Sequence, residues 1–119
     1  MKKIVEIKSI GFNKVADYIK EGWDLYGVPC MTIGENAIPM QTIVKYSDEE
    51  IGGNIVETIM LKDSATTDDD GYRSYPDICK KANEYIKNGY QPYGTVMSIH
   101  KLKYGTNYVD EYLAMVKYE

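Results

Sequence analysis

The residues best suited to hold a ligand lie in one polar segment near the end of the sequence, where cations, aromatic rings and an amide alternate. Side chains of a strand point to alternate faces, so Lys101 and Lys103 share one face. Such a pair can hold phosphate groups through charge-assisted hydrogen bonds while a tyrosine ring stacks on a base. The alternative is a polar hairpin tip whose lysines keep it soluble. With one arginine from an earlier loop, the candidate residues are Arg73, His100, Lys101, Lys103, Tyr104 and Tyr108.

A second set of candidate residues is aromatic and occurs twice, each time next to a glycine. Its members are Trp23 and Tyr26, before Gly27, and Tyr90 and Tyr93, before Gly94. In one interpretation these rings close the core between a helix and a sheet. In the other they wall a pocket between two protomers, where a glycine lets a ligand approach the backbone.

Patterns typical of catalysis or metal binding are weak in this sequence. His100 is its one histidine, and a single histidine cannot form the usual metal site or catalytic triad. Cys30 and Cys79 have no metal-ligand spacing and fit small core residues. Residues 66–77 follow the calcium-loop template in part, but Thr66 replaces its first acidic ligand, so a solvated acidic loop is expected. We therefore expect no catalytic residue, no metal and no cofactor.

Length and charge narrow the class of protein further. A chain of 119 residues is expected to form one domain, and a net charge of −4 argues against general nucleic-acid binding, which needs a positive surface. Residues 47–77 hold nine acids against two cations, so the acidity belongs to a connector and a loop. No stretch has the roughly 20 apolar residues of a membrane-spanning helix, and acidic and basic residues interrupt any signal-peptide pattern. We expect a cytoplasmic protein.

An internal repeat organises the chain. Residues 18–27 and 85–94 are identical at six of ten positions, and residues 43–46 and 115–118 share the ending Val-Lys-Tyr. Self-similarity of this kind predicts two copies of one structural unit. The predicted organisation is a single domain over 1–119, with repeat one at 1–46, a connector at 47–53 and repeat two at 54–119.

Each copy has the pattern of a strand, a helix and two further strands. In the first copy, a strand is predicted at 4–8 and the hairpin turn around 34–36. Gly22 suits the left-handed position that ends a helix. The apolar residues at helical spacing before it are Phe12, Val15, Ala16 and Ile19.

In the second copy, the first strand is predicted at 55–61. Residues 74–77 resemble a capping box, with Pro76 in the first turn of the helix, and Gly89 repeats the helix stop. The second hairpin turn is predicted around 104–107, on a longer hairpin than that of the first copy. The buried face of the helix is predicted to hold Ile78, Ala82, Tyr85 and Ile86.

These elements predict an α+β fold. A unit of about 50 residues can lay one helix on three strands, and its core and sheet edges remain marginal. Two such units are expected to form one mostly antiparallel sheet of about six strands with both helices on one face. The other face then needs a cover, so we expect a homo-oligomer.

The repeated motif resembles a known family. Residues 22–27, Gly-Trp-Asp-Leu-Tyr-Gly, resemble the Gly-Trp-Glu-Leu-Tyr-Gly signature of a short domain-of-unknown-function family in bacterial and viral proteins. The endings at 41–45 and 113–117 are similar to its closing Gln-Ala-Met-Val-Lys. Copy two departs from the signature at Tyr90 and Pro92. The resemblance implies tandem copies of this domain and, because the family has no assigned activity, nothing about chemistry.

A looser resemblance concerns small phage proteins that act as sponges for nucleotide immune signals, such as the cyclic ADP-ribose products of Thoeris defence. Their small size, aromatic content and oligomeric state resemble those expected here. This resemblance implies a viral anti-defence protein that works in the host cytoplasm by sequestration.

Three functions remain, in order of preference. The first is a non-catalytic, oligomeric binding protein that sequesters a small cyclic nucleotide between tyrosines and lysines, with no nucleic acid or membrane as partner. The second is an interaction module that inhibits a host protein through the acidic connector and an aromatic surface. The third is a small enzyme of unknown reaction.

Overall fold

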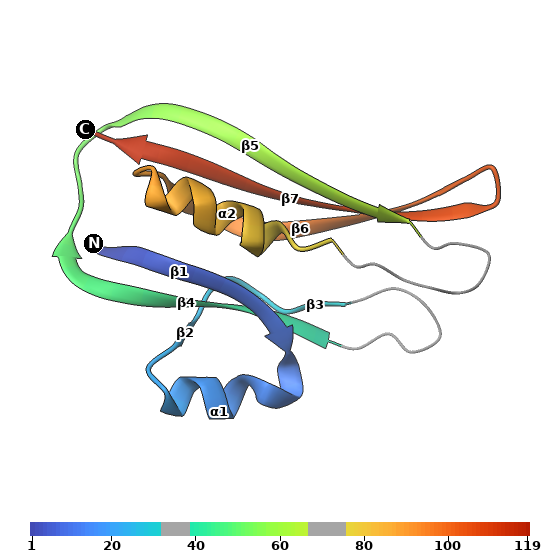
Figure 1. Ribbon diagram of the computed structural model, residues 1–119, viewed down its shortest axis with the longest axis horizontal. Helices are drawn as coiled ribbons and strands as arrows, with labels where there is room; N and C mark the ends of the chain where they lie inside the picture. Colours follow the sequence, from blue (N-terminus) through green and yellow to red (C-terminus); the bar gives the residue numbers. More distant parts are fainter. Residues whose placement is uncertain (32–38, 67–75) are drawn as a thin grey trace.

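Residues 1–31, 39–66 and 76–119 are described by the computed structural model (Figure 1). They form an α+β fold with two helices and two antiparallel sheets. The N-terminal sheet has the order β1–β4–β2, with β3 also paired to β4, and contains β1 (Lys2–Gly11), β2 (Asp24–Leu25), β3 (Cys30–Met31) and β4 (Pro39–Glu50). The C-terminal sheet has the order β5–β7–β6 and contains β5 (Ile55–Thr66), β6 (Gln91–Lys103) and β7 (Thr106–Tyr118).

The helices separate the sheets into layers. A short 3₁₀ turn (Phe12–Lys14) leads into α1 (Val15–Lys20), and α2 spans Ile78–Lys87. Helix α2 lies between the two sheets, and α1 lies on the far side of the N-terminal sheet (Figure 1). The expectation of one six-stranded sheet with both helices on one face was therefore wrong in its layering, although the helices and antiparallel strands are present.

Side-chain amides explain why the sheets stay separate. A continuous sheet would need a strand on the free edge of β1. Instead the Asn83 amide donates to the Ile7 carbonyl (2.9 Å) and accepts from the Ile7 N–H (2.8 Å). The Gln91 amide does the same for Ile4, at 2.9 and 2.7 Å. Two amides thus replace a strand, and they join the two halves of the chain.

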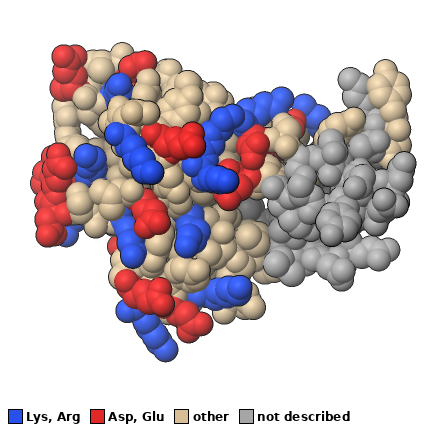
Figure 2. Space-filling model, viewed as in Figure 1, with Lys and Arg blue, Asp and Glu red and all other residues tan. Residues whose placement is uncertain are grey.

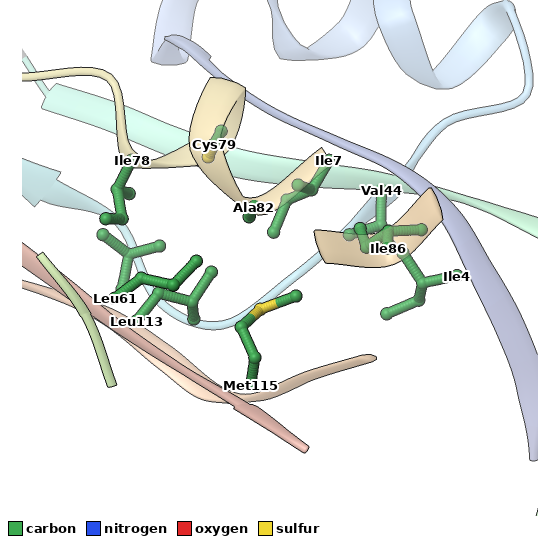
Figure 3. Packing of buried hydrophobic residues seen from close by; sticks show 11 residues of the cluster. Ile4, Ile7, Val44, Leu61, Ile78, Cys79, Ala82, Ile86, Leu113 and Met115 are labelled. Carbon is green, nitrogen blue, oxygen red and sulfur yellow. The ribbon is translucent and has the colours of Figure 1, made fainter. Parts of the chain in front are cut away.

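The main core fills the space around α2. Helix residues Ile78, Cys79, Ala82 and Ile86 meet strand residues from both sheets (Figure 3). Ile86 lies beside Ile4 and Val44 of the N-terminal sheet, and Ile78 lies on the side of Leu61 and Leu113 (Figure 3). A smaller second core lies under α1 and contains Ile10, Val15, Trp23 and Ile43.

The ends of the helices follow the sequence pattern closely. Gly22 and Gly89 both have positive φ, at 96° and 93°, directly after their helices, which confirms the predicted stops. The predicted start of α2 is corrected, because Asp77 is the cap: its carboxylate accepts from the Lys80 N–H at 3.2 Å. Pro76 therefore precedes the helix instead of lying in its first turn.

The two halves share one strand order and one register. In both, the first strand pairs with the last, which also pairs with the strand after the helix. Three strand pairings of the first half have a counterpart in the second. Glu6↔Lys45 corresponds to Glu57↔Lys117, and Ile4↔Tyr46 corresponds to Ile55↔Tyr118. Asp24↔Val44 corresponds to Gln91↔Val116.

The hairpin of β6 and β7 ends in a two-residue turn. Tyr104 and Gly105 have φ of 52° and 75°, and Lys103 pairs with Thr106 across the turn. Positive φ at both central residues is typical of the type I′ turn, whose twist matches that of the strands. The prediction of a turn at 104–107 is confirmed, whereas the turn predicted around 34–36 lies outside the described residues.

Strand β4 continues into the segment 47–53 predicted as the connector and ends at Glu50, opposite Lys2. Gly53 has φ of 98°, and a Cβ there would overlap the carbonyl group of Glu119. That contact lies beside a pair of backbone hydrogen bonds between Asn54 and Glu119, at 2.9 and 3.1 Å. These bonds join the first and last residues of the second half.

Candidate functional site

The predicted ligand residue Lys101 lies on the outer face of the C-terminal sheet, the face turned away from α2. Leu61, Leu113 and Met115 point toward α2, so side chains one position along each strand point outward. In the register, Lys101 stands opposite Tyr108. The outward residues include Met60, Lys62 and Ser64 of β5, Tyr93, Met97, Ile99 and Lys101 of β6, and Tyr108, Asp110, Tyr112 and Ala114 of β7.

The centre of this face is a buried carboxylate between two lysines. Asp110 accepts a hydrogen bond from the Ser64 hydroxyl at 2.6 Å and forms an ion pair with Lys101 at 3.1 Å. Lys62 approaches the same carboxylate at 4.0 Å. The hydrogen bonds from Ser64 and Lys101 lower the pKa of Asp110, and Asp110 in turn raises the pKa of Lys101. We call Lys62, Ser64, Lys101 and Asp110 the lysine cluster.

Aromatic rings border the lysine cluster. Tyr108 is half-buried opposite Lys101, and the Tyr112 ring centroid lies 5.8 Å from the Lys62 ammonium, within the range of a cation–π contact. Tyr104 is almost fully exposed at the turn. The cluster therefore places two half-exposed cations around a buried carboxylate, beside aromatic rings, on a face that no described element covers. Across the side of the molecule in Figure 2, by contrast, basic and acidic side chains are intermingled.

Three of the predicted residues around the hairpin have no described side chain. His100 and Lys103 belong to β6 through their backbone pairings with Val109 and Thr106. Arg73 lies outside the described residues, as do most of the calcium-loop residues at 66–77. Of the predicted set, Lys101 is thus a member of the lysine cluster, Tyr108 stands opposite it, and Tyr104 lies at the exposed turn.

The ring of Trp23 lies in the smaller core and not in a pocket. It is buried, meets Tyr18 edge to face at 5.9 Å, and stacks under the Lys45 ammonium at 4.9 Å and the Lys8 ammonium at 5.4 Å. Its position favours the interpretation in which the repeated rings close the core between helix and sheet.

Tyr90 occupies the corresponding position in the second half. It meets Tyr85 edge to face at 5.4 Å, with the Lys117 ammonium 4.6 Å from its centroid. Its hydroxyl donates to the Glu57 carboxylate at 2.7 Å, and this bond is the main reason that its pKa is raised. Tyr90 is also part of the packing around a helix.

The second ring of each pair differs between the halves. Tyr26 packs against the main core, and burial, followed by the nearby Tyr46 and Tyr118, raises its pKa to about 12. Tyr93 is instead exposed on the outer face of the C-terminal sheet, opposite Ala114. Of the four repeated rings, only Tyr93 shares a face with the lysine cluster.

The sequence analysis missed part of the lysine cluster. Lys62 and Ser64 are two residues apart, as are Tyr108, Asp110 and Tyr112, so period two already places each set on one strand face. The pairing of Ser64 with Asp110 across β5 and β7 brings these two groups of side chains together. Register over a separation of 46 residues depends on the whole sheet and could not be assigned from the local pattern.

A second unusual carboxyl lies on the opposite side of β7. Glu111 is buried at the start of α2, where it accepts a hydrogen bond from the Ile78 N–H. Burial, with the neighbouring Asp77 and Asp63, raises its pKa to about 7. Asp63 also accepts from the Asp77 N–H at 2.7 Å. Even so, no group of three or more potential ligands in the described ranges could hold a metal ion.

In the described part of the chain, no helix has the length and apolarity to cross a membrane. Comparisons of this chain with protein-family models, with curated proteins and with solved structures find no match.

Proposed function

We propose that this protein is a non-catalytic binding protein that sequesters a small, phosphorylated nucleotide on the lysine cluster. The specific function we favour is that of a phage anti-defence sponge for a cyclic nucleotide signal in the host cytoplasm. The observation that carries the proposal is the pair of lysines, Lys62 and Lys101, held on either side of Asp110 on an uncovered face bordered by tyrosine rings.

Such a site would bind its ligand through charged hydrogen bonds to phosphate groups and through stacking of a base on a tyrosine ring. Phosphate oxygens would take the place of the Asp110 carboxylate at Lys101 and Lys62, whose ammonium groups are half exposed. A base would stack on Tyr108 or Tyr112. Two cations against one carboxylate leave the cluster positive while the whole chain is negative. Sequestration requires affinity alone, and these groups supply it without a reaction.

We also propose that the chain arose by tandem duplication of one unit, which supports the resemblance to the Gly-Trp-Glu-Leu-Tyr-Gly domain. The support comes from the shared strand order and register of the two halves. The paired rings Tyr18–Trp23 and Tyr85–Tyr90 also have the same edge-to-face geometry. In this proposal the second copy acquired the longer hairpin that carries the binding face.

Calorimetry against a panel of cyclic and linear nucleotides tests the function. At least one member should bind at micromolar concentration, and Lys62→Ala with Lys101→Ala should weaken it at least tenfold while the protein still unfolds in one cooperative thermal transition. The control is Lys80→Ala with Lys87→Ala, which removes the same charge from the exposed side of α2. If no nucleotide binds and a pull-down from host lysate returns a stoichiometric protein, the interaction module is the better function.

A further inference from the structure

Among the described residues, the layered fold leaves one helix face and one sheet face uncovered. The layers run α1, N-terminal sheet, α2, C-terminal sheet (Figure 1). The N-terminal sheet has a helix on both faces, but the C-terminal sheet has a described helix on one. Helix α1 likewise contacts one sheet, whereas α2 contacts two. The contact between α2 and β1 inside the chain therefore has no counterpart for α1 and β5.

The helices show the difference at corresponding positions. Cys79, Asn83 and Ile86 lie on one face of α2, and this face meets β1, because Asn83 bonds to Ile7. Counted back from the repeated Tyr-Ile-Lys sequence, the same positions of the first helical segment hold Phe12, Ala16 and Ile19. Cys79 and Ile86 are 2% and 4% exposed, whereas Phe12 and Ile19 are 47% and 45% exposed. The apolar residues are present in both helical segments, with Phe12 in the 3₁₀ turn before α1, and only one set is covered.

The first strands show the same difference. Ile4 and Ile55 correspond, since they pair with Tyr46 and Tyr118 at the same point of the register. Ile4 is 5% exposed under α2, and Ile55 is 41% exposed. Val5 and Val56, one position along, are exposed in both halves. The uncovered surface of β5 thus matches the surface of β1 that α2 covers.

We propose that a second copy of this chain completes the layers: α1 of one copy packs on β5 of the next, as α2 packs on β1 within the chain. The contact joins two different surfaces, so it is heterologous and builds a ring or an open row of copies. This assembly does not depend on the proposed ligand. Ile55 and Lys62 are seven residues apart on β5, about 23 Å along an extended strand, so the contact leaves the lysine cluster accessible.

The contact between copies is expected to be weaker than the contact inside the chain. Ala16 stands where α2 has Asn83, and Asp24 stands where β6 has Gln91. Neither side chain can both donate and accept, so the two amide bridges to the strand edge are not repeated. Burial of Phe12, Ile19 and Ile55 must then supply the affinity, and assembly should depend on protein concentration.

Sedimentation of the full chain over a range of protein concentrations tests whether α1 of one copy packs on β5 of the next. The wild-type protein should sediment as dimers and larger species, and Ile19→Glu and Ile55→Glu should each sediment as a monomer. The matched controls are Lys20→Glu and Val56→Glu, which should assemble like the wild type. Their counterparts Lys87 and Val5 remain exposed although α2 packs on β1, so both controls lie outside the contact.

A mixture of the two monomeric variants separates this proposal from a symmetric dimer. Ile19→Glu keeps an intact β5 surface, and Ile55→Glu keeps an intact α1 surface. An equimolar mixture should form a one-to-one dimer and nothing larger. Dimers in the mixture also show that both variants fold. A monomeric wild type, assembly of either variant alone, or a mixture without dimers would overturn the proposal, and none of these outcomes depends on nucleotide binding.

Discussion

The two halves of the chain have the same strand pairing and differ in what lies on it. Trp23 with Lys45 in the first half corresponds to Tyr90 with Lys117 in the second, with each lysine over the ring. Yet the N-terminal sheet lies between two helices, whereas the C-terminal sheet has a described helix on one face and the lysine cluster on the other. Similar local sequence thus specifies similar pairing, while the neighbours in space decide which face becomes core and which becomes surface.

The largest expected effect comes from breaking the joint between the halves. Gln91→Met keeps the volume of the side chain but leaves the buried Ile4 N–H and C=O without partners. Unpaired buried groups cost about 1–3 kcal/mol each, so we expect a loss of about 3 kcal/mol in the free energy of unfolding, measured with urea. This is a large share of the stability of a small domain.

The corresponding position of the first half provides the control for this variant. Asp24 has the register of Gln91 but is exposed, so Asp24→Ala should change the free energy of unfolding by less than about 0.5 kcal/mol. An equal loss in the two variants would show that the Gln91 amide does not hold the halves together.

The sequence predicts the parts of this fold that depend on local pattern. Helical spacing and Gly22 located α1, and the turn at Tyr104 and Gly105 followed from its residue types. The separation of the two sheets was not predictable, because Asn83 and Gln91 look like surface amides in the sequence. Their role as substitutes for a strand appears only when β1 lies beside them in space.

The candidate site was predictable to a similar extent. Period two placed Lys101 on one strand face, and Tyr108 was named as a stacking residue. Asp110 was missed as the partner of Lys101, because the pairing of charges across two strands depends on register. The burial of Trp23 was one of two open interpretations, since a large ring beside a glycine fits a core and a pocket equally well.

A smaller effect is expected from a carboxyl that only the second half has. Glu111 lies where β4 has Pro39, and its pKa is raised from 4.5 to about 7 in the folded protein, mainly by burial. The folded state therefore binds a proton more tightly than the unfolded chain, and stability falls as the pH rises from about 4.5 to above 7. Glu111→Gln should be about 2 kcal/mol more stable than the wild type at pH 8.

Urea denaturation at several pH values measures this effect. At pH 4 the wild type and Glu111→Gln should have nearly equal free energies of unfolding, because the carboxyl is then protonated in both states. Glutamine can still accept the hydrogen bond from the Ile78 N–H, so the comparison isolates the charge. A difference that does not change between pH 4 and pH 8 would contradict the raised pKa.

The smallest expected effect concerns the charge of Asp110 in the lysine cluster and its influence on ligand affinity. In Asp110→Asn, the residue can still accept from Ser64, but Lys101 and Lys62 lose the charge that opposes an incoming phosphate. Loss of this negative charge beside the two ammonium groups favours an anion there, so inorganic pyrophosphate and the nucleotide found in the panel should bind severalfold more tightly. The pKa of Lys101, followed by NMR, should fall toward its ordinary value, since Asp110 raises it in the wild type.

A lower pKa of Lys101 with unchanged ligand affinity would mean that the ion pair exists but that the ligand binds elsewhere. The outer face of the C-terminal sheet would then serve only the contact with a second copy.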